Sequence, residues 1–328
     1  MMRRFLLSTA CVFTGFVTSV VSTPALAQDY PNSPIKIVVP FTPGGGNDFL
    51  ARDIGGMLSQ KYNQSVVVEN RPGAGGAIGS AQVARSPADG YTLMIAANTA
   101  AMVDATRSDL TFSLTEDFNS IGKVADMPIM LVVNPELGVK TVQELIALAK
   151  SKPGMLNYAS SGPGTVQHMA AALFAEITGT EMEHVPYKGA SQMMPEILAN
   201  RIQVLFGPAN SVLPHIKSGG LVPLGVASNE RWQEMPELPT IAEQGVDGYH
   251  VDLWYAFLAP AGTPKEIIAK LNRDLNTYLD DADTRKRYMG QALTPAKSTP
   301  EEMDQRMVDD EALWKGVAKK INLQLGAQ

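Results

Sequence analysis

The hydrophobic positions of the chain alternate between short apolar runs and longer stretches with helical spacing. An apolar run at residues 35–41 is followed by Pro43 and three glycines, and residues 49–58 then place apolar side chains at helical intervals. This pattern predicts a buried strand, a tight glycine loop and the capped N-terminus of an amphipathic helix. The glycines leave backbone N–H groups uncovered, and a helix N-terminus carries partial positive charge, so the unit is suited to holding an anion.

Strand-like runs continue to alternate with helical stretches along the chain. We expect strands at residues 65–68, 91–96, 129–133, 156–159, 183–187, 204–206, 221–227 and 251–260. This alternation favours an α/β fold with a mostly parallel sheet. A second small-residue loop, 160–165, again lies between a strand and a helix. Two such units without a low-complexity linker predict two lobes, joined by strands that cross near Asp126 and Trp254.

The first 27 residues have the layout of a secretory signal. Two arginines precede a largely apolar stretch, residues 5–21, and residues 24–27 end in a small-residue cleavage pattern. The apolar stretch is short and is diluted with Ser, Thr and Gly, which favours cleavage after Ala27 over a membrane anchor. We therefore expect an exported, periplasmic protein whose single cysteine, Cys11, is removed with the signal peptide.

Charge and composition narrow the class of partner. The formal net charge of −6 becomes −8 when Arg3 and Arg4 leave with the signal peptide. An acidic protein of this kind is not expected to bind nucleic acid or an anionic membrane surface. The remaining chain of about 300 residues contains no cysteine, so a sizeable hydrophobic core must hold it together without disulfides.

Several cofactor motifs are incomplete in this sequence. The glycine-rich stretch 73–79 has the spacing G-x-G-x-x-x-G, follows Pro72 and lacks the later acidic residue of a dinucleotide site, so it predicts a tight loop. Neither glycine loop continues into G-K-[ST], which argues against a nucleotide-phosphate loop. The four histidines are far apart and do not pair at ligand spacing. We expect no cofactor and no metal.

Other interpretations of the polar residues stay open at this level. Ser160 or Ser161 follows a predicted strand, and an exported serine hydrolase could assemble a histidine and an acid around either one, although the G-x-S-x-G motif is absent. A ligand sensor for a regulatory membrane protein is a further alternative. His168, one turn into its helix, either caps and packs or faces a ligand, and Asp48 is favoured as an organiser of its own loop.

The chain resembles the Bug family, the extracytoplasmic solute-binding receptors of tripartite tricarboxylate transporters, in the sequence and order of seven segments. The segments that carry the resemblance are PIKIVVPFTPGGGNDFLAR (34–52), VVVENRPGAGGAIG (66–79), ADGYTL (88–93), NYASSGPGTVQHMA (157–170), HVPYKG (184–189), LPHIKSG (213–219) and APAGTP (259–264). They cover essentially the whole mature chain in the order of the family.

The resemblance implies a two-lobe periplasmic-binding-protein fold, type II-like, with a ligand cleft between the lobes. Residues 28–126 and 255–328 are expected to form lobe 1, and residues 127–254 lobe 2. The implied function is that of a monomeric receptor, not an enzyme, which captures a small organic carboxylate and delivers it to membrane transporter subunits. The residues implied in ligand binding are Thr42, Pro43, Gly44, Gly45, Gly46, Asp48, Asn98, Thr99, Ser160, Ser161, Gly162, Thr165, His168, Tyr187, Lys188, Gly207 and Asn210.

Two positions depart from the pattern of the family, and both are expected to border the cleft. Gly207 stands where many relatives carry an acidic residue, and Ala256 stands where a glycine often follows the aromatic pair. Loss of the acidic side chain would admit a second anionic end, or a bulkier aromatic end, of the ligand.

Overall fold

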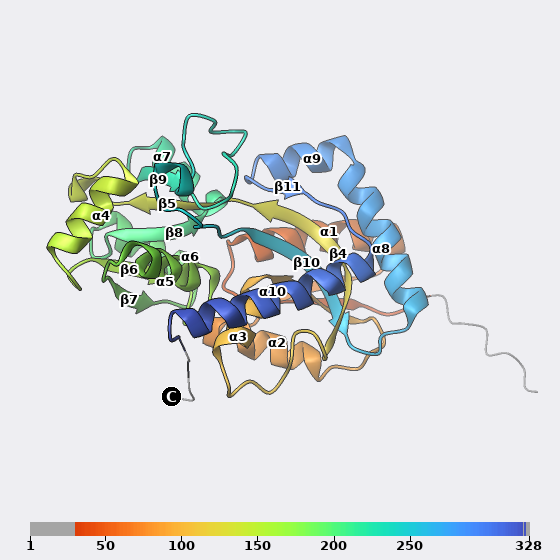
Figure 1. The fold of residues 1–328 in the computed structure, drawn as a ribbon. Helices are drawn as coiled ribbons and strands as arrows, with labels where there is room; N and C mark the ends of the chain where they lie inside the picture. The colour runs from red at the N-terminus through yellow and green to blue at the C-terminus, as the bar shows by residue number, and fades with distance from the viewer. Residues whose placement is uncertain (1–29, 324, 326–328) are drawn as a thin grey trace, which may run out of the picture. The chain divides into compact units, whose positions relative to one another are not determined.

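Two β-sheets, each covered by helices, make up the computed structural model, which describes residues 30–323 and 325 (Figure 1). The predicted signal peptide, residues 1–27, lies outside the described residues. The first sheet has the order β11-β4-β10-β3-β1-β2, and its strands are β1 (Ile35–Val39), β2 (Val66–Asn70), β3 (Thr92–Ala97), β4 (Phe118–Met127), β10 (Leu253–Pro260) and β11 (Thr294–Pro295). The second sheet has the order β7-β6-β8-β5-β9, and its strands are β5 (Ile129–Val133), β6 (Asn157–Ser160), β7 (Glu183–Pro186), β8 (Val204–Pro208) and β9 (Val222–Val226).

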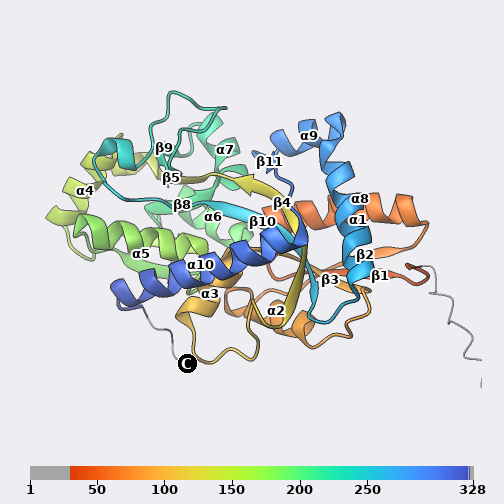
Figure 2. The ribbon, with the colours of Figure 1, turned by 45° about the vertical axis from the view of Figure 1, so that its right-hand side comes forward.

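Helices follow the strands and cover the faces of both sheets. The α-helices are α1 (Gly46–Tyr62), α2 (Ala77–Ala84), α3 (Thr99–Thr106), α4 (Val142–Ser151), α5 (Val166–Thr178), α6 (Ala190–Leu198), α7 (Ala209–Lys217), α8 (Lys265–Asp280), α9 (Ala282–Met289) and α10 (Pro300–Lys320), with short 3-10 turns η1 (Ala74–Gly76), η2 (Pro135–Leu137) and η3 (Ala242–Gln244). Helix α1 packs on β1, β2 and β3, whereas α5 packs on β6 and β8. Figure 2 shows the same division, with α4 to α7 around the second sheet and α1, α2 and α8 around the first.

The expectation of a mostly parallel sheet is wrong. Strand β1 runs parallel to β2 and β3, and β6 runs parallel to β7 and β8. However, β10 is antiparallel to β3 and β4, β4 is antiparallel to β11, and β5 is antiparallel to β8 and β9. The antiparallel pairs involve the strands that carry the chain between the sheets. Their direction is set by that passage and not by a βαβ crossover helix.

The chain passes between the sheets at two places. Strand β4 ends at Met127, Pro128 follows, and β5 then begins the second sheet at Ile129. After β9 the chain returns to the first sheet and forms β10. All eight residues of β10 are buried. A strand that is buried along its whole length has helices or loops on both faces, which makes β10 a central element of the first sheet.

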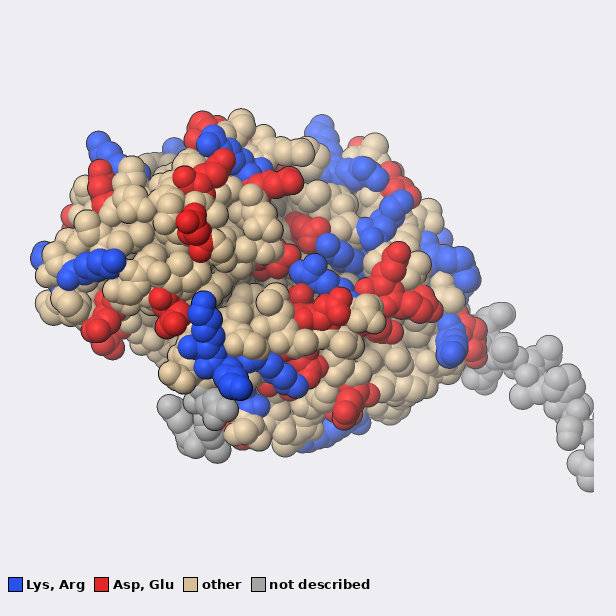
Figure 3. Space-filling model, in the orientation of Figure 1, with Lys and Arg blue, Asp and Glu red and all other residues tan. Residues whose placement is uncertain are grey.

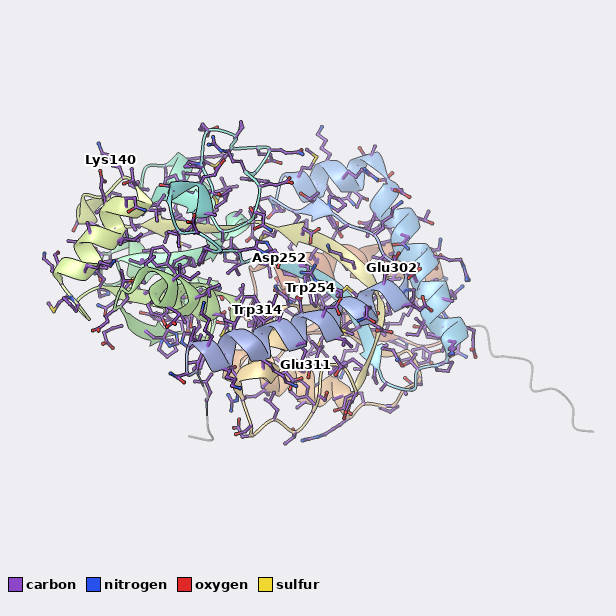
Figure 4. All side chains as sticks on the ribbon, in the orientation of Figure 1. Lys140, Asp252, Trp254, Glu302, Glu311 and Trp314 are labelled. Carbon is purple, nitrogen blue, oxygen red and sulfur yellow. The ribbon has the colours of Figure 1, made fainter. Side chains whose placement is uncertain are left out.

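The C-terminal helix α10 is attached to the start of β10 by a buried polar cluster. The indole Nε1 of Trp254 donates to Oδ2 of Asp310 at 2.6 Å, and Arg306 Nε lies 2.9 Å from the other carboxylate oxygen. Figure 4 shows Asp252 and Trp254 beside α10, which carries Glu302, Glu311 and Trp314. Because the Asp310 side chain is almost fully buried, its carboxylate depends on these two partners.

Charged side chains of both signs lie on the surface of the described part of the chain. On the face drawn in Figure 3, described basic and acidic side chains are interspersed, and no continuous basic area is present. Within residues 30–323, every helix is too short or too polar to cross a bilayer.

We predict that Asp310→Ala lowers the free energy of unfolding by about 1–3 kcal/mol, because it leaves the buried indole N–H of Trp254 without an acceptor. Urea unfolding at neutral pH measures this change. The matched control is Asp309→Ala, on the exposed side of the same helix turn. Equal effects of the two substitutions would contradict the role assigned to Asp310.

Candidate functional site

A cavity of about 70 Å³ lies where segments from both sheets meet. Its walls come from the β1–α1 loop, the end of β3, the β6–α5 loop, α6, β8 and β10. The lining residues are Phe41, Thr42, Gly45, Gly46, Asn47, Asp48, Ala97, Thr99, Ser161, Val166, Gln167, Gly189, Met193, Met194, Leu205, Pro208, Ser211, Leu253 and Tyr255. This volume accommodates several water molecules or the polar end of a small ligand.

Five of the described helices begin at this cavity. Helix α1 brings its N-cap Gly45 and its first turn to the cavity, α3 brings Thr99, and α5 brings Val166 and Gln167. Helices α6 and α7 bring the residues that precede them, Gly189 and Pro208. The N-terminus of a helix exposes N–H groups that have no partner within the helix and carries a partial positive charge.

None of these five helices has a side-chain cap. No side chain accepts a hydrogen bond from the first-turn N–H groups at the N-cap positions of α1, α3, α5, α6 or α7. Away from the cavity, Thr141, Asp281 and Thr299 cap α4, α9 and α10, whereas α2 and α8 also begin without a side-chain cap. Apart from the N–H of Ala209 in α7, which donates to the carbonyl oxygen of Pro128, the first-turn N–H groups at the cavity have no side-chain acceptor and could serve an anionic ligand.

Asp48 organises the loop that precedes α1. Its carboxylate accepts a hydrogen bond from the N–H of Gly44 at 3.1 Å and another from Nδ2 of Asn70 at 3.0 Å, and Arg52 lies 2.9 Å away. Burial alone would raise the pKa of Asp48, but the bonds from Arg52, Asn70 and Gly44 outweigh it and hold the pKa below its usual value. The carboxylate is thus ionised and already paired, as expected of a loop organiser.

The side chain of Tyr255 packs closely against the backbone of Gly46, beside this loop. A Cβ on Gly46 would lie 2.3 Å from the Tyr255 hydroxyl, so only glycine fits there. The hydroxyl donates to the sulfur of Met127 at 3.7 Å, a weak acceptor, and burial raises the pKa of Tyr255 well above its usual value. Tyr255 therefore stays neutral and keeps a hydroxyl at the cavity wall.

Ser161 faces the cavity, whereas Ser160 does not. The Ser161 hydroxyl donates to Oε1 of Gln167 at 2.9 Å, and both residues line the cavity. Ser160 is fully buried, and its Oγ lies 2.5 Å from Nε2 of His184 and 3.0 Å from both the N–H and the carbonyl oxygen of Gly162. The serine that is paired with a histidine is thus closed off from the cavity, and the serine at the cavity has an amide partner. This arrangement does not suit a serine nucleophile.

The β6–α5 loop rests on a stack of aromatic rings. The rings of His168 and His184 lie 4.0 Å apart at 8°, and Tyr158 stacks on His184 at 5.0 Å. Burial lowers the pKa of His168 to about 3, with a contribution from neighbouring His184, and burial lowers the pKa of His184 to about 4. His168 Nδ1 accepts the N–H of Gly164 at 3.0 Å. Both rings are neutral at pH 7, and they support the loop from behind.

The two halves of the site meet through glycines. A Cβ on Gly162 would lie 3.2 Å from the backbone nitrogen of Gly75, and a Cβ on Gly189 would lie 2.0 Å from Oγ1 of Thr42. Gly75 and Thr42 precede α2 and α1, which flank the first sheet, whereas Gly162 and Gly189 belong to the half that contains the second sheet. Larger residues at these positions would hold the two halves apart.

The structure brings six of the predicted ligand residues to the cavity: Thr42, Gly45, Gly46, Asp48, Thr99 and Ser161. Tyr187, Lys188 and Gly162 instead line an adjoining cavity of about 300 Å³, which also contains Ser161. Neither of these two cavities is lined by Pro43, Gly44, Asn98, Ser160, Thr165, His168, Gly207 or Asn210.

Several predicted ligand residues that do not line either cavity are hydrogen-bonded or tightly packed within the protein. Asn98 is fully buried and donates to the carbonyl oxygen of Asp252 at 2.8 Å. Thr165 donates to the carbonyl oxygen of Gly162 at 2.7 Å, and a Cβ on Gly207 would lie 2.6 Å from Val212. Ala256 is buried within β10, while its neighbour Tyr255 lines the cavity.

Sequence reasoning missed part of the lining. The first turn of α5, Val166 and Gln167, was within reach, because it directly follows a loop that was predicted to bind. The apolar lining residues from α6, β8 and β10 carry no motif, and only the fold places them together. The missed residues are Phe41, Asn47, Val166, Gln167, Met193, Met194, Leu205, Pro208, Ser211 and Leu253.

The described residues contain no group of three His, Cys, Asp or Glu side chains arranged to hold a metal ion. His168 and His184 are the one pair of histidine rings recorded in contact there, and their nitrogens bond to Gly164 and Ser160. One nitrogen of each ring is therefore engaged within the protein: Nδ1 of His168 as an acceptor and Nε2 of His184 with the Ser160 hydroxyl.

Comparison with known proteins identifies the class of protein to which this fold and cavity belong. The model of the tripartite tricarboxylate transporter family receptor matches residues 50–323. The chain is 34% identical over 310 residues to protein BugT of Bordetella pertussis, covering 94% of this chain and 95% of that protein. The chain belongs to the tripartite tricarboxylate transporter receptor family, which is a family of receptors and not of enzymes.

Solved structures of this family share the fold. A protein of R. palustris solved with adipate has a TM-score of 0.87 at 34% identity, covering 91% of this chain and 100% of that chain. The periplasmic binding protein BugD has a TM-score of 0.85 at 28% identity, covering 91% and 100%. MatC from Rhodopseudomonas palustris, solved with bound malate, has a TM-score of 0.84 at 26% identity, covering 88% and 99%. The predicted two-lobe α/β binding-protein fold is confirmed.

We predict that the free energy of unfolding falls as the pH is lowered from 7 toward 4. The pKa values of His168 and His184 in the folded protein, about 3 and about 4, lie below their usual value of 6.5. As the pH falls, these two histidines take up protons in the unfolded chain before they do so in the folded protein. The contribution of the neutral rings to the free energy of unfolding is therefore fully present above pH 6.5 and is lost on acidification. Urea unfolding at pH 7, 6 and 5 measures the slope. His184→Gln should flatten it, and the control His215→Gln, outside the stack, should not. A slope that His184→Gln leaves unchanged would contradict this.

Proposed function

We propose that this protein is a periplasmic receptor that captures a small organic carboxylate and delivers it to a membrane transporter of the tripartite tricarboxylate type. One observation carries the proposal: five helix N-termini without side-chain caps meet at one cavity whose lining contains no lysine or arginine. Such a site neutralises an anion with backbone N–H groups. A charge-assisted hydrogen bond contributes about 1.5–3 kcal/mol, so a few of them suffice for affinity.

The carboxylate binds, in this proposal, at the ends of α1, α3 and α5. The first turns of α1 and α3 bring the N–H groups of Gly46 and Asn47 and the hydroxyl of Thr99 to the cavity, and the β6–α5 loop brings the hydroxyl of Ser161. Relatives solved with adipate and with malate support a carboxylate as the ligand. Tyr187 and Lys188, on the adjoining cavity, are proposed to contact ligand or water at the entrance.

The remaining expectations form part of the same proposal. Residues 28–126 with 255–328 act as one lobe and residues 127–254 as the other, and closure of the lobes around the ligand presents a distinct form to the transporter. The assignment of β4 and β5 to different sheets, on either side of Pro128, supports this division. The chain is exported with cleavage after Ala27 and acts as a monomer without cofactor, metal or nucleic acid.

A thermal-shift screen tests the carboxylate ligand. Protein freed of co-purified ligand is heated with dicarboxylates, tricarboxylates, acidic amino acids, and aliphatic and aromatic acids. A ligand present at about 100 times its Kd should raise the free energy of unfolding by about 2.7 kcal/mol. Absence of a shift with every carboxylate at high concentration would overturn the proposal.

We predict that Gly45→Val lowers ligand affinity by about 100-fold, while the melting temperature stays near that of the wild type. A Cβ on Gly45 meets no atom within 4 Å, so the added side chain enters the open cavity, where it blocks about two charge-assisted bonds. Calorimetric titration measures the affinity. Gly56→Val, an open position further along the same helix, is the control. Normal binding by Gly45→Val would show that the loop does not contact the ligand.

A further inference from the structure

One wall of the cavity is apolar, and its residues lie outside the sequence segments that carry the family resemblance. Met193 and Met194 come from α6, Leu205 from β8, and Leu253 and Tyr255 from β10. Apart from the half-buried Met194, these side chains are almost fully buried, so they form part of the core and the cavity is the space that they leave. A wall of this kind stabilises a ligand by removing apolar surface from water, at about 25 cal/mol per Å².

The N-terminus of α7 adds little to anion binding at this wall. Pro208, which precedes α7, has no N–H group, and the next N–H, that of Ala209, already donates to the carbonyl oxygen of Pro128 at 2.9 Å. The hydroxyl of Ser211 donates to Oδ1 of Asn210 at 3.2 Å. The uncapped helix ends that bring donors to the cavity are therefore those of α1, α3, α5 and α6, and α7 contributes little.

Charge in the lining is limited to one residue. Asp48 is the only charged residue among those that line the cavity, and its carboxylate is paired with Arg52. A second carboxylate of a ligand, placed against Met193 and Leu205, would lose its water and gain no cation. Burying an unpaired charge costs several kcal/mol.

We propose that the cavity selects an acid with one carboxylate and an apolar tail over a dicarboxylate. This inference rests on the proposed carboxylate receptor function and narrows its ligand class. The carboxylate lies at the N-termini of α1, α3 and α5, and the tail lies against the methionines of α6 and the side chains of β8 and β10. Methionine is flexible and polarizable, so Met193 and Met194 adapt to an aliphatic or an aromatic tail. The preferred ligand of this chain would then differ from the ligands in the solved relatives, because adipate and malate are both dicarboxylates.

Matched acid pairs test the inference by calorimetric titration of ligand-free protein at pH 7.5. Hexanoate and adipate have the same chain length and differ only in the distal carboxylate, as do butyrate and succinate, and benzoate and terephthalate. We expect at least one monoacid to bind at least tenfold more tightly than its matched diacid, and no diacid to bind more tightly than its monoacid. Any other order among acids that bind overturns the inference and leaves the proposed function intact. If no acid of this panel or of the thermal-shift screen binds, both are overturned.

A charge inserted in the apolar wall provides an independent test. Met194 is half-buried at the cavity, so Met194→Arg places a guanidinium beside the proposed tail position. This variant should weaken hexanoate binding and strengthen adipate binding, each by at least tenfold. Met155→Arg is the matched control, because Met155 is 70% exposed and does not line the cavity. If Met194→Arg does not fold, Met194→Gln should weaken hexanoate by severalfold. An unchanged preference in the folded variant would show that this wall does not contact the tail.

Discussion

The structure of the site depends on one constraint: the first N–H groups of a helix have no acceptor within that helix. Elsewhere in the described chain, the side chains of Thr141, Asp281 and Thr299 meet this need for α4, α9 and α10, and α2 and α8 have no side-chain cap. At the cavity five helices begin without a side-chain cap, and only α7 has its first N–H bonded to a backbone carbonyl, that of Pro128. The helix ends therefore bring partial positive charge to the cavity without any cationic side chain in its described lining. An anion that enters this region completes the hydrogen bonding of the helices. This explains why the β1–α1 loop is built from glycine and why Asp48 is paired away from the cavity.

The helices that begin at the cavity pack on two different sheets. The site therefore forms only when the two sheets are close together. The contacts between them use residues that lack side chains, Gly75 against Gly162 and Gly189 against Thr42. Strand β10 crosses this region, brings Tyr255 to the cavity, and is attached to α10 through Trp254 and Asp310. The glycines therefore have two separate functions: some expose N–H groups to a ligand, and others allow the two halves to meet.

The histidine stack explains how a serine-rich loop can belong to a binding protein. Ser160 lies beside His184, a pairing that a hydrolase would use, but its hydroxyl is buried and bonded back to Gly162. The neutral rings of His168 and His184 fill the space beneath the loop and fix its shape. The pairing thus positions Ser161 at the cavity, and the buried serine has no route to a substrate. Membership of a receptor family agrees with this arrangement.

The sequence by itself determined the features that depend on local chemistry. The strand–glycine–helix units and the separation of the chain into two α/β halves follow from hydrophobic spacing and from the backbone freedom of glycine. The side-chain cap that the sequence predicted at the start of α1 is absent from the structure. The tertiary structure alone decided strand direction, because β4, β5 and β10 follow the passage of the chain between the sheets. It also decided which side chains line the cavity. Met193, Leu205 and Leu253 are ordinary core residues in sequence, and only packing between distant elements makes them part of the cavity wall. Long-range packing of this kind has no local signal, since any apolar residue of suitable size satisfies the same pattern.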